Sequence, residues 1–148
     1  MQTIPVKIKK LNDNAILPTY GTQYSAGADL YACEGKEITV LPHQTTFIHT
    51  GVSVELPNGT VGVICARSGL SSKRALAPAN KVGIIDCDYR GELIVALHNH
   101  SNEPQTILDK ERIAQLLILP CFVADFVQVD CLEQTSRGSD GFGSTGRT

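Results

Sequence analysis

Residues 80–91 read Asn-Lys-Val-Gly-Ile-Ile-Asp-Cys-Asp-Tyr-Arg-Gly and show a pattern that recurs along the chain, a short apolar run followed by turn residues. The run from Val82 to Ile85 is rich in β-branched residues and predicts a buried strand, and the polar cluster closed by Gly91 predicts its hairpin turn. Asp86 and Tyr89 are therefore expected at a strand end. Side chains there have a fixed direction and can still face a pocket, which suits a carboxylate that aims at one water molecule. An ordinary Asp-rich turn is the alternative interpretation.

Further short apolar runs predict a chain built almost entirely of strands. Alternating or β-branched patterns occur at residues 4–9, 47–56, 60–66, 92–99, 112–119 and 126–131. Turn residues separate them at Pro42, Pro57-Asn58-Gly59, Asn102-Glu103-Pro104 and Pro120. Ser68 to Ala75 predicts one short helix, with Ser68 or Ser71 as its cap. We expect an all-β fold, a distorted jelly-roll-like antiparallel barrel or sandwich.

The last residues differ in composition from the rest of the chain. The apolar pattern stops after Glu133, so we expect one β domain over residues 1–133 and a flexible Gly-rich arm over residues 134–148. A frayed tail is the simple interpretation of the arm. Phe142 favours a second interpretation. An aromatic ring alone among glycines on a flexible arm is typical of a lid that closes over a planar, phosphorylated ligand.

Composition limits the classes of function. The chain has 148 residues, of which 42% are hydrophobic and 19% charged, the balance of a soluble globular protein. Its net charge of -2 gives no basic surface for a nucleic acid. The start of the chain has no apolar signal core, and every apolar run is too short to span a bilayer. We therefore expect a cytoplasmic protein without nucleic acid or membrane partners.

Cysteine and histidine give little indication of a metal site. The five cysteines are widely spaced and contain no Cys-x-x-Cys pair, which predicts reduced and mostly buried thiols. His98 and His100 alternate at the end of an apolar run and would face one side together. Two histidines without a third ligand make a weak metal site, so packing at a strand end is the favoured interpretation.

Three other stretches combine glycine or hydroxyl groups with charge. Ser25 to Leu30 presents an acid after a glycine turn. Ala66 to Leu70 places a guanidinium, a hydroxyl and bare backbone at the expected helix start, a combination that can bind an anion. Arg112 to Gln115 places two polar side chains inside an apolar run. Each stretch is weak evidence when taken alone.

Taken together and in order, these stretches resemble one family, the homotrimeric dUTPases (deoxyuridine triphosphate nucleotidohydrolases). Ala66 stands where the second motif of the family commonly has proline, and it supplies no chemical group. The five family motifs match at Ala26–Leu30, Ala66–Leu70, Gly83–Gly91, Glu111–Gln115 and Arg137–Gly146.

The resemblance implies cleavage of dUTP to dUMP and pyrophosphate, which keeps uracil out of DNA and supplies dUMP for dTMP synthesis. Asp86 would orient and deprotonate the water that attacks the α-phosphorus in line. Mg²⁺ would be held mainly by the triphosphate, with Asp29 contacting it through water. The residues implied to hold the phosphates are Arg67, Ser68, Gly69, Gln115, Arg137, Ser144 and Thr145.

The resemblance also implies how the base and sugar are selected. Backbone groups would bond the uracil edge, Phe142 would stack on the ring, and Tyr89 would lie under the deoxyribose and exclude a 2′-hydroxyl. Asp88 is left open between a paired-carboxylate metal site with Asp86 and a turn or inter-subunit contact. The residues implied to contact uracil and deoxyribose are Asn80, Gly83, Ile84, Ile85, Tyr89, Phe142 and Gly143.

The family also implies a homotrimer in which each site borrows the arm of another subunit. Two other functions stay open. A dCTP deaminase on the same fold would carry Arg-Ser-Ser where this chain has Arg67-Ser68-Gly69, and it would release ammonia from dCTP. A catalytically silent β-sandwich would bind nucleotide or a protein partner without turnover.

Overall fold

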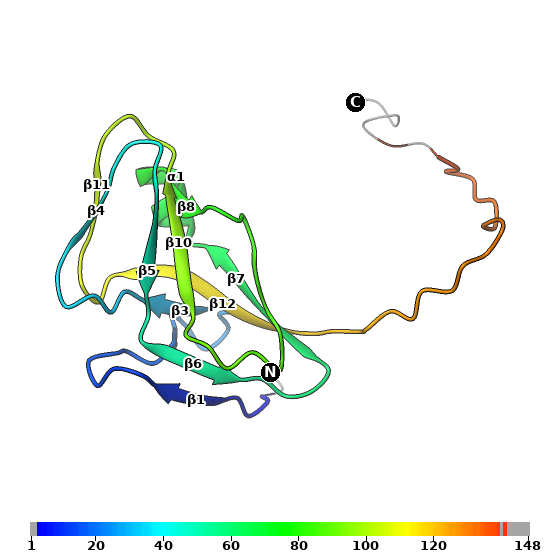
Figure 1. The fold of residues 1–148 in the computed structure, drawn as a ribbon, viewed down its shortest axis with the longest axis horizontal. Helices are drawn as coiled ribbons and strands as arrows, with labels where there is room; N and C mark the ends of the chain where they lie inside the picture. The colour runs from blue at the N-terminus through cyan, green and yellow to red at the C-terminus, as the bar shows by residue number, and fades with distance from the viewer. Residues whose placement is uncertain (1–2, 140, 142–148) are drawn as a thin grey trace.

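The structure is a computed structural model and describes residues 3–139 and 141. Strands dominate it, and the single helix among the described residues is short (Figure 1). The elements in chain order are β1 (Lys7–Lys10), β2 (Thr19–Tyr20), β3 (Ala28–Tyr31), β4 (Ile38–Val40), β5 (Thr45–His49), β6 (Val52–Glu55), β7 (Thr60–Ala66), α1 (Ser68–Arg74), β8 (Leu76–Pro78), β9 (Gly83–Ile85), β10 (Ile94–Asn99), β11 (Gln105–Ile107) and β12 (Arg112–Pro120).

All of the strand pairs are antiparallel. The larger sheet has the order β2-β3-β12-β7-β9, a second has the order β5-β10-β8, and β1-β6 and β11-β4 form two smaller pairs. Apolar side chains of both main sheets meet in one core, including Ile48 and Leu97 from the second and Leu30, Ile64 and Leu116 from the larger. The prediction of an all-β antiparallel fold with one short helix is confirmed.

Alternation explains which strand faces are buried. In β10, Val95, Leu97 and Asn99 are buried and the intervening residues are more exposed, as expected for a strand with one face on a core. Asn99 is polar and fully buried. Its amide nitrogen donates to the carbonyls of Val40 at 3.0 Å and Glu103 at 2.8 Å, so its burial leaves no donor unsatisfied.

Several local predictions were wrong. The helix begins after Arg67 and has no side-chain cap; Ser71 Oγ donates to the Arg67 carbonyl from within the helix. The run at residues 82–85 is an exposed edge and not a buried strand, since Ile84 is 60% exposed. The run at residues 47–56 forms two strands, because Gly51 turns the chain between β5 and β6 with φ +68°.

The free cysteines also differ from the prediction. Cys121 and Cys131 are exposed, and Cys33, Cys65 and Cys87 are only half-buried. All five cysteines are free of disulfides, in agreement with the prediction, but they are not mostly buried.

Residues 121–139 extend away from the two sheets after β12 (orange in Figure 1). The predicted strand at residues 126–131 does not form, because this segment has no neighbouring strand to bond its backbone. Its large apolar side chains are exposed, with Phe122 at 95% and Phe126 at 94%. Within the described part of the chain, no helix is both long and apolar enough to cross a membrane.

Candidate active site

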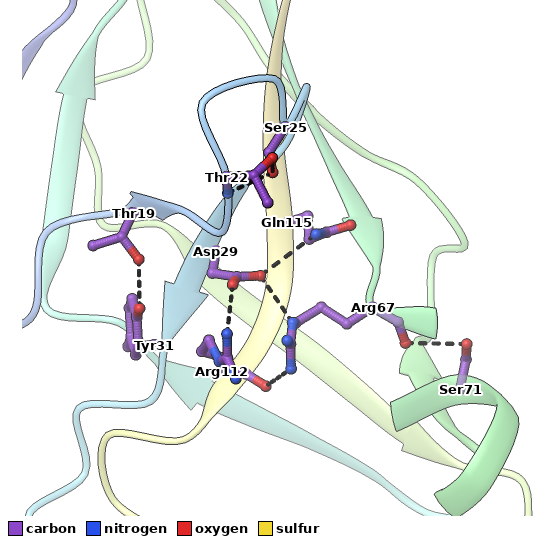
Figure 2. A network of polar contacts seen from close by, with 9 residues as sticks. All are labelled: Thr19, Thr22, Ser25, Asp29, Tyr31, Arg67, Ser71, Arg112 and Gln115. Atoms are coloured by element: carbon purple, nitrogen blue, oxygen red, sulfur yellow. Dashed lines mark hydrogen bonds and ion pairs between the residues drawn. The ribbon is translucent and has the colours of Figure 1, made fainter. Parts of the chain in front are cut away.

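Asp29 is the centre of a polar cluster that joins three side chains from two other parts of the chain (Figure 2). It lies in the middle of β3 and its side chain is only 6% exposed. Arg67 Nε donates to Oδ1 at 2.8 Å, and Arg112 donates to Oδ2 at 3.3 Å. A carboxylate buried to this degree is stable in its charged form only with such partners.

The backbone brings these side chains together from three strands. Gln115 on β12 stands opposite Asp29 in the strand register, and its Nε2 lies 3.5 Å from Oδ1, at the long limit of a hydrogen bond. The register of β12 shifts between Arg112 and Ala114, which turns the Arg112 side chain toward the same carboxylate. Arg67 follows the last residue of β7.

Arg67 also joins the start of α1 to the body of the protein. One of its terminal nitrogens donates to the Arg112 carbonyl at 3.1 Å, and its own carbonyl accepts the Ser71 hydroxyl of α1 at 3.1 Å. Ser68 and Gly69 are the first two residues of the helix, and both are exposed. The structure therefore brings together five of the residues that the sequence suggested for phosphate or magnesium: Asp29, Arg67, Ser68, Gly69 and Gln115.

The described residues contain no group of three or more His, Cys, Asp or Glu side chains that could hold a metal ion. Asp29 is nearly closed off and both of its oxygens accept from arginine. These donors fit Mg²⁺ only in an outer sphere, through water, with oxygens supplied by another molecule as its direct ligands.

A second group of predicted residues surrounds a small cavity of about 230 Å³. Asp86 follows β9 directly and is exposed, and Tyr89 belongs to the turn after it, so both lie at a strand end as predicted. Asp86 and Asp88 occupy exposed positions in the same turn, and only Asp86 lines the cavity. The lining residues are Ile84, Ile85, Asp86, Tyr89, Glu92 and Ile94.

The Tyr89 ring is fixed by contacts within its own turn. Its hydroxyl donates to the Glu92 carbonyl at 3.0 Å, and its backbone N–H donates to the Asp86 carbonyl at 3.1 Å. A Cβ built on Gly91 would fall on the Tyr89 ring and hydroxyl, so only glycine leaves room for the ring in this place. The turn therefore holds Asp86 and Tyr89 in a fixed relation.

The residues predicted to contact uracil lie along β9, the outer strand of the larger sheet. Gly83, Ile84 and Ile85 pair with β7 on one side, which leaves the backbone groups of the other edge available for a ligand. The Asn80 side-chain nitrogen would lie 3.5 Å from a Cβ built on Gly83. Asn80 thus stands at the start of the same edge.

The two groups are far apart within one chain. Ile85 pairs with Gly62 near the start of β7, so Asp86 lies beside Val61, whereas Arg67 follows the end of β7. Six residues of strand separate these positions, or roughly 20 Å at the rise of a β-strand. The structure does not bring Asp86 next to Arg67 within a single chain.

Arg137 lies in the extended segment beyond β12, outside both groups. Phe142, Gly143, Ser144 and Thr145 were also predicted to bind substrate, and they lie outside the described residues.

The comparisons with known proteins agree with the motifs. A family model described as dUTPase matches residues 13–146. The deoxyuridine 5′-triphosphate nucleotidohydrolase of Desulfitobacterium hafniense is 48% identical over 149 residues, covering 99% of each chain. That of Syntrophotalea carbinolica is 41% identical, again over 99% of each chain.

This chain belongs to the dUTPase family.

Solved structures show the same fold. A mutant of the Staphylococcus bacteriophage 80alpha dUTPase with dUpNHpp superposes with a TM-score of 0.87 at 30% identity, covering 97% of this chain and 99% of that chain. A mutant dUTPase of phage phi11 of S. aureus has a TM-score of 0.78 at 25% identity, covering 88% of this chain and all of the other, and its description names a structural Mg(II) ion. The resemblance seen in the sequence to a dUTPase is confirmed.

Sequence reasoning gave no role to His49 or Glu92. Glu92 lines the cavity with Asp86 and Tyr89, and its carboxylate contacts His49 at 2.8 Å. The position of Glu92 directly after the third motif was the available signal. His49 offered none, since it is more than 40 residues away and meets Glu92 only through the pairing of β5 with β10.

Proposed function

We propose that this dUTPase cleaves dUTP to dUMP and pyrophosphate by in-line attack of a water molecule on the α-phosphorus. The observation that carries the proposal is the fixed pair of Asp86 and Tyr89 at the end of the outer strand β9, facing one cavity. The family membership of the chain supports the same reaction.

Asp86 is the general base. Its carboxylate orients the attacking water and takes its proton, a contribution worth about 10²- to 10⁴-fold in rate. The direct attachment of Asp86 to β9 limits its motion, and the turn bond from the Tyr89 N–H to the Asp86 carbonyl restrains it further. A base held in this way needs little reorganisation at the moment of reaction.

Selection of the nucleotide lies in the same element. The free backbone edge of Gly83 to Ile85 and the Asn80 amide beside it bond the uracil edge, and this fit excludes a 5-methyl group. Tyr89 lies under the deoxyribose and excludes a 2′-hydroxyl. A site of fixed polar groups rejects a wrong base because its donors and acceptors are then left unpaired.

The cluster around Asp29 receives the phosphates. Arg67, Ser68 and Gly69 supply guanidinium, hydroxyl and backbone donors, and Gln115 adds its amide. Asp29 holds Arg67 in place through the 2.8 Å contact and contacts Mg²⁺ through water. Mg²⁺ bound by the triphosphate offsets its negative charge, as in other phosphoryl transfers.

Each site is made by more than one copy of the chain. The separation of roughly 20 Å between Asp86 and Arg67 within one chain, from the rise of β7, is too long for one nucleotide's α-phosphate to reach both groups. A closed cyclic trimer brings Asp86 of one copy to Arg67 of the next in three equivalent sites. Residues 134–148, at the end of the segment that leaves the sheets after β12, act as the arm that closes each site, with Arg137, Ser144 and Thr145 at the γ-phosphate and Phe142 and Gly143 at the uracil.

In the cell, this reaction keeps uracil out of DNA and supplies dUMP for dTMP synthesis. We propose a cytoplasmic location for this reaction.

The test of the mechanism is Asp86→Asn. The variant should bind a non-hydrolysable dUTP analogue with a dissociation constant close to that of the original chain and lose about 10²- to 10⁴-fold in kcat, because the amide cannot take the proton. Asp88→Asn is the matched control, since Asp88 is exposed in the same turn but does not line the cavity. It should keep its turnover. Original turnover in Asp86→Asn, or an equal loss in both variants, would exclude Asp86 as the base.

A further inference from the structure

Glu92 lines the cavity of Asp86 and Tyr89, and both oxygens of its carboxylate make contacts with other residues. Its Oε1 accepts the Gly51 N–H at 2.7 Å, and its Oε2 lies 2.8 Å from His49 Nδ1. The Glu92 side chain is 21% exposed and that of His49 is 50% exposed. Both oxygens of the carboxylate are thus occupied by the turn between β5 and β6.

The same turn holds the backbone that follows. The Leu93 N–H donates to the Val52 carbonyl at 2.9 Å, and the buried Thr50 hydroxyl donates to the Leu93 carbonyl at 2.6 Å. Residues 92 and 93 are therefore tied to residues 49–52 by backbone and side chain together. The Glu92 carbonyl, in the peptide group held by Val52, accepts the Tyr89 hydroxyl at 3.0 Å.

Gly91 makes no side-chain contact that could fix the turn of Asp86 and Tyr89. It precedes Glu92 and lies against the Tyr89 ring. The side chain of the next residue, Glu92, therefore ties this turn to residues 49–51.

The charge state of His49 favours a stable contact with Glu92. The hydrogen bond to Glu92 raises the pKa of His49; partial burial opposes this, and the negative charges of Glu92 and Glu34 add to it. The imidazole is protonated more readily than an isolated histidine, which strengthens its bond to the carboxylate.

We propose that His49 and Glu92 are positioning residues that set the preference for deoxyribose over ribose by fixing Tyr89. This inference rests on the proposed function, in which Tyr89 excludes the 2′-hydroxyl. Neither residue touches the reacting atoms. They act through the hairpin, by keeping the Tyr89 ring close enough to the sugar to leave no space for an added oxygen.

The test compares kcat/KM for dUTP and for UTP. In Glu92→Ala and His49→Ala, the ratio of dUTP to UTP should fall about tenfold, the size expected for one lost charge-assisted hydrogen bond. Glu92→Gln keeps an acceptor for the Gly51 N–H. His49→Asn keeps a side-chain nitrogen close to the position of the His49 Nδ1. Glu92→Gln and His49→Asn should therefore stay within about twofold of the original ratio.

The matched control is His98→Ala. His98 also makes a side-chain bond from its Nδ1, to Thr45 Oγ1 at 2.9 Å, but it does not line the cavity. Its removal should leave the ratio unchanged. A double-mutant cycle with Tyr89→Phe adds a second criterion, since a residue that acts through Tyr89 has little further effect once the tyrosine hydroxyl is gone.

A readout without turnover separates this proposal from the proposed function. The ring NMR signal of ¹³C-labelled Tyr89, assigned by its loss in Tyr89→Phe, should shift or broaden in Glu92→Ala and His49→Ala and stay in place in His98→Ala. If the original chain does not cleave dUTP, the proposed function fails, while this signal still tests the positioning role. An unchanged ratio and an unchanged signal in both alanine variants would overturn the proposal. Loss of the fold in Glu92→Ala or His49→Ala would overturn it as well, because a positioning role requires that the protein fold without the contact between His49 and Glu92.

Discussion

At the scale of single residues, Asp29 joins the chemistry of the site to the stability of the fold. Its carboxylate is almost closed off from solvent, and Arg67 and Arg112 neutralise it from two different strand ends. The same contacts hold Arg67 in the place where a phosphate is proposed to bind. Removal of the charge should therefore affect both unfolding and substrate binding.

We predict that Asp29→Asn lowers the free energy of unfolding by about 3 kcal/mol, because it leaves two arginines without their buried counter-charge. Urea denaturation measures this value. Glu55→Gln is the control, since the Lys7–Glu55 pair has the same 2.7–2.8 Å geometry but is exposed, with Glu55 at 44%. Exposed pairs contribute little, so Glu55→Gln should show no measurable change. Similar small effects in both variants would contradict the account of Asp29.

At the scale of elements, the sequence predicted the strands that carry strong apolar patterns. β7, β10 and β12 were found at residues 60–66, 94–99 and 112–120 because their alternation or β-branching is visible in the chain. Short strands such as β4 and β11 were missed, since three residues carry too little pattern and form only through their mutual pairing. The helix cap was misjudged for a related reason, because Ser71 bonds backward to Arg67 from within the helix.

The candidate site was also predicted only in part. Its residues were identified through motifs, whose order along the chain is visible in the sequence. The separation of Asp86 from Arg67 was not predicted, because it follows from the register of β9 on β7, which no local sequence pattern shows. The role of His49 was hidden for the same reason, since only the pairing of β5 with β10 brings it to Glu92.

The turn between β5 and β6 gives a test at this scale. Gly51 has φ +68°, and a Cβ there would lie 2.8 Å from the Ala15 Cβ and 3.0 Å from Cys33 Sγ. Gly59 has a similar φ of +77° but no described atom within 4 Å of its built Cβ. Gly51→Ala should therefore lower the free energy of unfolding by roughly 2 kcal/mol more than Gly59→Ala, the cost of overpacking beyond that of backbone strain. Thermal unfolding of both variants checks this, and equal losses would show that crowding at Gly51 does not matter.

At the scale of the whole molecule, the single chain exposes surface that suggests assembly. Phe122, Phe126 and Leu132 project from the segment beyond β12 with exposed fractions of 84–95%. Large apolar side chains exposed together mark an interaction surface, because water solvates them poorly. The divided site and this segment are both consistent with the proposed assembly of several copies of the chain.

Subunit complementation tests the divided site. Asp86→Asn and Arg67→Ala chains should each be nearly inactive alone, and mixed trimers formed by co-expression should regain activity in about a third of their sites, where an intact Arg67 meets an intact Asp86 of the neighbour. Monomeric behaviour in sedimentation, or no recovery in mixed trimers, would show that one chain supplies both groups, and dimeric behaviour would contradict the trimer. A mixture of Asp86→Asn and original chains provides the reference for subunit exchange.

Residues 80–91 are proposed to select deoxyuridine triphosphate and to cut it at the α-phosphate. The decisive experiment measures pyrophosphate release in parallel with dUTP, UTP, dTTP and dCTP. We predict rapid release from dUTP alone, with UTP rejected at the sugar, dTTP at the 5-methyl group and dCTP at the base edge. Comparable release from UTP or dTTP, or ammonia released from dCTP, would contradict it.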